Sequence, residues 1–105
     1  FPLDGVRKHE LMPGSLARKI PKLYEQDGVE DPIVYTKFFN PYGRGPWLVT
    51  EFDGRDEGFG YVIITQGELG YFSLSELATA NRNGLPLIER DLSWRPMPLS
   101  KAKGR

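Results

Sequence analysis

The sequence has no cysteine among its 105 residues, which excludes disulfide bonds, cysteine-ligated zinc, iron–sulfur clusters and thiol nucleophiles. Histidine is nearly absent as well, since His9 is the only one. It lies in a segment without helical or alternating periodicity, which would not hold a general base in a fixed position. A chain this short buries one modest core. We therefore expect packing to supply the stability, and we expect no cofactor.

Long apolar runs are also missing. No stretch approaches the ~18 uncharged residues of a membrane-spanning helix, and the first residues lack the apolar segment of a secretory signal. These absences predict a cytoplasmic protein that is not inserted in a membrane. We expect an N-terminal tail (1–12), a single domain (13–99) and a basic C-terminal tail (100–105).

There is no net charge either, because 14 basic side chains balance 14 acidic ones. The distribution is uneven, since residues 25–76 are acidic and both ends are basic. A general nucleic-acid binder usually carries an excess of Lys and Arg. The balance leaves a nucleic-acid interface as an alternative in which folding would bring both ends together. Its candidate residues are Lys19, Lys22, Arg90 and Arg95, with Trp94 beside them.

Four segments are rich in β-branched and aromatic side chains and are bounded by Gly, Pro, Asn or Asp. They are residues 33–39, 47–52, 59–65 and 69–72. Their connections are too short for parallel crossovers, so we expect an antiparallel meander, to which residues 87–94 add a fifth strand. The predicted fold class is α+β, with a four- to five-stranded antiparallel meander sheet and two short helices.

The two helices have recognisable start signals. Ser15 can cap the first, which would dock on the sheet through Ile20. The second begins with a capping box, in which Ser73 and Glu76 satisfy each other's backbone N–H groups. Residues 83–84, Asn-Gly, then supply a left-handed stop.

Alternation along the strands predicts which side chains form the core. It places Val34, Phe38, Leu48 and Phe52 on one apolar face. If the other face stays open, its apolar side chains form a patch that requires a partner. The candidate partner-binding residues are Tyr35, Trp47, Val49 and Trp94. The alternatives are that the N-terminal helix, the tail or a second copy of the chain covers this face.

Carboxylates are the only catalytic groups present in number. Glu51 and Asp53 project from one side of a strand end, and Asp56 and Glu57 follow in the next turn. Converging oxygens of this kind could hold a divalent cation, as a metal-dependent nuclease requires. The interpretation that we favour is turn chemistry, in which Asp accepts local backbone hydrogen bonds and Gly supplies a positive φ.

Two segments have a distinctive order of aromatic, capping and charged residues, namely ELGYFSLSEL at 68–77 and LPLIERDL at 85–92. Through them, and over about residues 16–100, the chain resembles a bacterial family catalogued as domain of unknown function 2958. The resemblance implies an origin on conjugative plasmids, integrated elements or phage-like islands. Some members carry the name of single-stranded DNA endonuclease. The resemblance assigns no catalytic residues.

These observations favour a non-catalytic interaction protein, an accessory or counter-defence factor of a mobile element or phage that binds another protein. The physical support is the neutral total charge, the acidic middle and the lack of a convincing catalytic set. One alternative is a metal-dependent single-stranded DNA endonuclease that uses Glu51, Asp53 and Asp56. The other is a nucleic-acid-binding module that uses the basic residues of the two ends.

Overall fold

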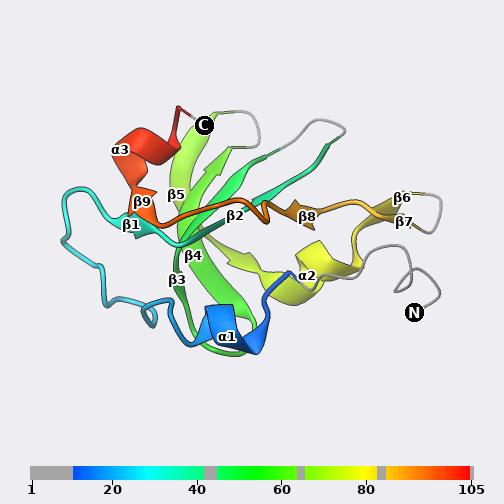
Figure 1. Ribbon diagram of the computed structural model, residues 1–105, viewed down its shortest axis with the longest axis horizontal. Coiled ribbons are helices and arrows are strands. Elements are labelled where there is room, and N and C mark those ends of the chain that lie inside the picture. The colour runs from blue at the N-terminus through cyan, green and yellow to red at the C-terminus, as the bar shows by residue number, and fades with distance from the viewer. Residues whose placement is uncertain (1–10, 42–44, 64–65, 83–84, 105) are drawn as a thin grey trace.

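The strand-forming segments assemble into one five-stranded antiparallel sheet in the order β5-β4-β3-β2-β8 (Figure 1). The computed structural model describes residues 11–41, 45–63, 66–82 and 85–104. The strands of this sheet are β2 (Thr36–Phe39), β3 (Trp47–Phe52), β4 (Glu57–Ile63), β5 (Gly67–Ser73) and β8 (Glu89–Arg90). The predicted α+β class with an antiparallel meander is therefore confirmed.

Short elements surround this sheet. They are the helices α1 (Gly14–Ala17), α2 (Leu74–Thr79) and α3 (Leu99–Ala102), and the strand pairs β1 (Ile33–Val34) with β9 (Met97–Pro98) and β6 (Asn81–Arg82) with β7 (Leu85–Pro86). The predicted strand 33–39 is divided, because its first two residues pair with β9 and its last four lie in the main sheet. The predicted fifth strand 87–94 is reduced to β8, which pairs with β2.

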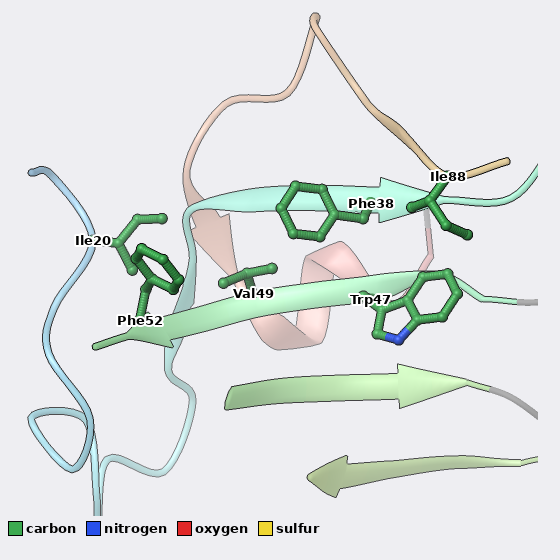
Figure 2. Packing of buried hydrophobic residues seen from close by; sticks show 6 residues of the cluster. All are labelled: Ile20, Phe38, Trp47, Val49, Phe52 and Ile88. Carbon is green, nitrogen blue, oxygen red and sulfur yellow. The ribbon is translucent and has the colours of Figure 1, made fainter. Parts of the chain in front are cut away.

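The main core covers one face of the sheet. It consists of Ile20, Phe38, Trp47, Val49, Phe52 and Ile88. Figure 2 shows their side chains on one side of β2 and β3, with Ile20 and Phe52 together at one end. Phe38 is fully buried and meets the ring of Phe72 edge-on, with the ring centroids 6.1 Å apart. Burial of one such ring stabilises the fold by about 1.5–3 kcal/mol. The α1 segment is too short to be stable alone, and it is held here because Leu16, Ala17 and Ile20 pack in or against this core.

A β-bulge in β3 decides which side chains face this core. The pairing register places Trp47 opposite Phe38 and Leu48 opposite Lys37, so Leu48 does not share a face with Phe38. The register with β4 then shifts between Val49 and Glu51. The extra residue turns Phe52 to the main-core face and Glu51 to the opposite face. The prediction that Val34, Phe38, Leu48 and Phe52 share one apolar face is therefore wrong, because uninterrupted alternation does not hold along β3.

A small core occupies the opposite face of the sheet. It consists of Val34, Leu48, Leu99 and Ala102. Ser100 fastens α3, since its backbone N–H and its hydroxyl donate to Asp31 at 2.9 and 2.7 Å. The predicted C-terminal tail is therefore wrong for α3, which is docked on the sheet. Residues 11–12, which the prediction placed in the N-terminal tail, pack against the main core. The rest of that predicted tail, with His9, lies outside the described residues.

The helix start signals have different outcomes. The capping box is confirmed on one side, because the Ser73 hydroxyl accepts the Glu76 N–H at 3.4 Å. The helix α2 ends at Thr79, and the predicted Asn-Gly stop lies outside the described residues. The Ser15 cap is wrong, because α1 begins at Gly14 and Pro13 occupies its N-cap. Within the described ranges, no helix is long and apolar enough to cross a membrane.

Candidate functional site

The predicted partner-binding patch is not open in the structure. Trp47 is only 7% exposed and Val49 is fully buried, and both belong to the main core. Tyr35 is half-buried against the same cluster. The expectation of an exposed face at these residues is therefore wrong, because Ile20 and the segments that follow β5 cover it.

Trp94 lies elsewhere, against the small core. Its indole Nε1 donates to the carbonyl of Val34 at 3.1 Å, and the Lys37 Nζ lies 5.8 Å from its ring centroid. A shallow hollow of about 330 Å³ adjoins the ring, and Arg95 is among its lining residues. The structure therefore separates Trp94 from the other three candidates.

The predicted turn at residues 53–58 is confirmed by its hydrogen bonds. One Asp53 carboxylate oxygen accepts the N–H groups of Arg55, Asp56 and Glu57 at 2.7, 2.8 and 3.1 Å. These bonds, that of Arg55 foremost, lower the pKa of Asp53. Gly54 supplies a positive φ of 90°. Asp53 thus has the structural task that its turn position indicated.

The side chains of Asp56 and Glu51 accept hydrogen bonds at different places in the fold. Asp56 accepts the Ser73 hydroxyl and the Ser75 N–H, both at 2.7 Å, so it joins the turn to the start of α2. Glu51 points to the face of the sheet opposite the main core. In the part of the chain that the structure describes, no three His, Asp or Glu side chains are placed to hold one metal ion. The structure does not bring the predicted metal ligands together.

The bonds to Asp56 predict a pH dependence. The Ser73 hydroxyl, followed by the Ser75 N–H, lowers the pKa of Asp56 below its ordinary value of 3.8. A carboxylate with a lowered folded-state pKa stabilises the fold fully above 3.8 and loses this contribution as the pH falls through the folded-state value. We expect Asp56→Asn to reduce stability at pH 7 and to weaken the acid dependence below pH ~4. Urea unfolding at several pH values measures both effects, and an NMR titration in which Asp56 titrates at 3.8 or above would contradict the assignment.

The basic candidates are distributed over the surface. Lys19 and Lys22 are exposed after α1, and the Lys22 ammonium lies beside Gly54 in the turn between β3 and β4. Arg90 is on β8, at the sheet edge beside β2, and Arg95 is at the Trp94 hollow. Figure 1 shows the α1 segment and β8 on different parts of the molecule. The structure therefore does not gather these four residues into one patch.

Among the described residues, one concave surface is a groove that the sequence did not reveal. We call it the tyrosine groove; it has a volume of about 500 Å³ and lies between the loop 24–32, the strands β3–β5 and the helix α3. The pairing register arranges its floor in two rows. The first row is Glu51, Phe59 and Tyr71, and the second is Tyr61 and Leu69. Tyr24, Asp27, Glu30 and Lys103 also line the groove.

The loop that borders this groove is held by a buried carboxylate. Glu51 is 4% exposed, and its two oxygens accept the N–H groups of Tyr24 at 2.8 Å and Gln26 at 2.7 Å. The Gln26 side chain donates to the carbonyls of Thr50 and Ile33 and accepts the Ile33 N–H. The loop 24–32 is thus attached to β3 and to β1 beside the groove.

Tyr24 has a strained backbone at the same point. Its φ is +73°, in the left-handed region that a residue with a Cβ adopts at a cost of about 1–2 kcal/mol. Its side chain is nevertheless 67% exposed. A hydrogen bond with Tyr24, followed by burial, raises the pKa of the Tyr71 hydroxyl to about 12. The strained backbone thus places an exposed ring beside Tyr71. Backbone strain of this kind is typical of functional sites.

The sequence held one signal for this groove. Phe59 and Tyr61, like Leu69 and Tyr71, are two residues apart and therefore share a face of their strands. Alternation leaves the face of the third strand open, so it does not assign these rings to one surface. No sequence pattern indicated that Tyr24 would join them, because it lies in a loop and is placed by bonds to a strand distant in sequence.

The comparisons place the chain in a family without assigning it an activity. The family of proteins of unknown function DUF2958 matches residues 12–102, and the chain belongs to this family. No curated protein and no solved structure matches it significantly. The resemblance expected from the two sequence segments is confirmed.

Proposed function

We propose that this member of the family is a non-catalytic interaction protein that binds an extended, basic segment of another protein in the tyrosine groove. The observation that carries the proposal is the convergence of exposed apolar side chains on one hollow. Tyr24, Leu69 and Tyr71 are 67, 55 and 50% exposed, and all three line the groove. Apolar side chains that gather in this way are typical of binding surfaces. The mobile-element or phage setting is part of this proposal and rests on the family resemblance.

The charges of the groove select the occupant. Its lining includes the acidic side chains of Asp27, Glu30 and Glu51 against the single basic side chain of Lys103. A nucleic acid would meet repulsion here, since phosphate neutralisation supplies much of its affinity. A basic polypeptide segment meets attraction. The edge strand β5 borders the groove with Leu69 and Tyr71, which suits a segment in extended conformation.

A display library of random twelve-residue peptides tests this proposal. We expect enriched peptides to bind the wild type and to lose tenfold or more in affinity on Leu69→Ser, since a central apolar contact often dominates an interface. Leu92→Ser is the matched control, because Leu92 is also an exposed leucine, at 64%, and does not line the groove. Binding should be measured by titration of each purified peptide.

Tyr24→Gly separates binding from folding. Glycine adopts the φ of +73° without strain, so we expect this variant to be as stable as the wild type, or more stable by up to about 1 kcal/mol. It should still lose the enriched peptides, because the ring is gone. Failure to enrich any peptide, or enriched peptides that bind both groove variants like the wild type, would contradict the proposed function.

A further inference from the structure

The first row of the groove combines aromatic rings with negative charge. The rings of Phe59 and Tyr71 pack at 4.8 Å between centroids, and Glu51 lies in the same row. Glu51 is bonded to backbone N–H groups, which are neutral and do not cancel its charge. Glu57 is on the same face by alternation with Phe59. After the hydrogen bond with Tyr24 and burial, the negative charges of Glu57 and Glu51 also raise the pKa of the Tyr71 hydroxyl.

The second row shows what such a surface attracts. The Lys103 Nζ lies 4.4 Å from the centroid of the Tyr61 ring. This is a cation–π contact made by the chain's own ammonium group. Lys103 follows the short helix α3 and contacts a ring of the second row, so this lysine does not lie on the rings of the first row, which has the two carboxylates.

We infer that the tyrosine groove recognises a lysine or arginine side chain of the bound segment, which lies on the rings of Tyr71 and Phe59 with its charge toward Glu51 and Glu57. This inference rests on the proposed function and makes it specific. The apolar stem of such a side chain covers aromatic surface while its charged end stays near carboxylates. Lys103 then acts against binding, because its positive charge is in the same groove.

A pair of peptides of equal shape tests the recognition of charge. One is an acetylated threonine–leucine hexapeptide with a central arginine, and the other has citrulline, a neutral isostere, at that position. We expect the arginine peptide to bind the wild type about fivefold or more tightly, and this ratio to fall as salt is added. The readout is the change in the NMR signals of Tyr24, Phe59 and Tyr71.

Matched substitutions locate the effect. Glu57→Gln should reduce the preference for arginine two- to fivefold, whereas Glu68→Gln should not, because Glu68 is an exposed glutamate on the other face of the sheet. Lys103→Ala should strengthen arginine-peptide binding by a similar factor. Lys101→Ala, an exposed lysine of the same helix that does not line the groove, should leave it unchanged.

The outcomes distinguish the two proposals. Equal binding of the arginine and citrulline peptides, or weaker binding after Lys103→Ala, overturns the recognition of charge and leaves the groove as a protein-binding site. Absence of binding by both peptides, together with a display library that yields none, overturns both proposals.

Discussion

Replacement of Gly60 by alanine is expected to destabilise the protein by about 3 kcal/mol or more, which is the upper range for overpacking a close contact. A Cβ at this position would lie 1.9 Å from the Leu48 carbonyl oxygen and 3.1 Å from the Val49 Cα. Both atoms belong to the backbone of β3, so no side chain can rotate away. Relief requires β3 and β4 to separate beside the bulge on which both cores depend.

Gly70 provides the matched control, because it is paired with Gly60 across β4 and β5. A Cβ at Gly70 meets no atom within 4 Å. Gly70→Ala should therefore change the unfolding free energy by less than ~0.5 kcal/mol, or raise it by up to about 1 kcal/mol. Urea unfolding of the two variants measures the difference. Equal losses would show that any side chain in these strands is unfavourable and that the close approach to β3 is not the cause.

The sheet could be predicted because its signals are local. The segment 47–52 is rich in β-branched and aromatic residues between turn residues, and β3 has these bounds in the structure. The capping box at Ser73 and the turn at Asp53 are likewise encoded within four residues or fewer. In such cases the side chain bonds to its own neighbourhood, and the sequence contains both partners at a fixed spacing.

The faces of the sheet could not be predicted in the same way. The bulge after Val49 depends on how β3 and β4 align, which is a property of two strands together. The bulge places Glu51 and Phe52 on the faces opposite to those that simple alternation predicts. One extra residue in β3 therefore changes which side chains form the main core and which line the tyrosine groove. Both faces of β3 are also covered, which makes every one of its residues buried and removes the contrast that alternation uses.

The candidate site was hidden for a related reason. Alternation places Trp47 on the face opposite Leu48, which was expected to be open, but this face carries the main core, and Figure 2 shows Trp47 beside Ile88 at one end of it. The groove on the other face required the loop 24–32 and α3 to meet the sheet. Their attachment uses bonds from Gln26 to Thr50 and from Ser100 to Asp31, which join residues far apart in the chain.

Glu51→Ala should cost about 2–4 kcal/mol of unfolding free energy, because a part-buried site loses an ionised acceptor of two hydrogen bonds. The N–H groups of Tyr24 and Gln26 would lose their partner, and the strained conformation at Tyr24 would no longer be favoured. We therefore expect the loop 24–32 to detach from β3 and groove binding to fall with it. Hydrogen exchange at these two amides should accelerate far more than exchange in β4.

Glu30→Ala is the control for the loss of negative charge, since Glu30 is an exposed carboxylate that lines the same groove. It should leave stability within about 0.5 kcal/mol of the wild type, as is usual for surface substitutions. The loss of unfolding free energy in Glu51→Gln should lie between those in Glu51→Ala and Glu30→Ala, because the amide retains one acceptor oxygen but turns a donor toward the second N–H. A loss below ~1 kcal/mol in Glu51→Ala, with unchanged exchange at Tyr24 and Gln26, would mean that the loop is held by the Gln26 side chain alone. In that case the strain at Tyr24 would have another source than the carboxylate beneath it.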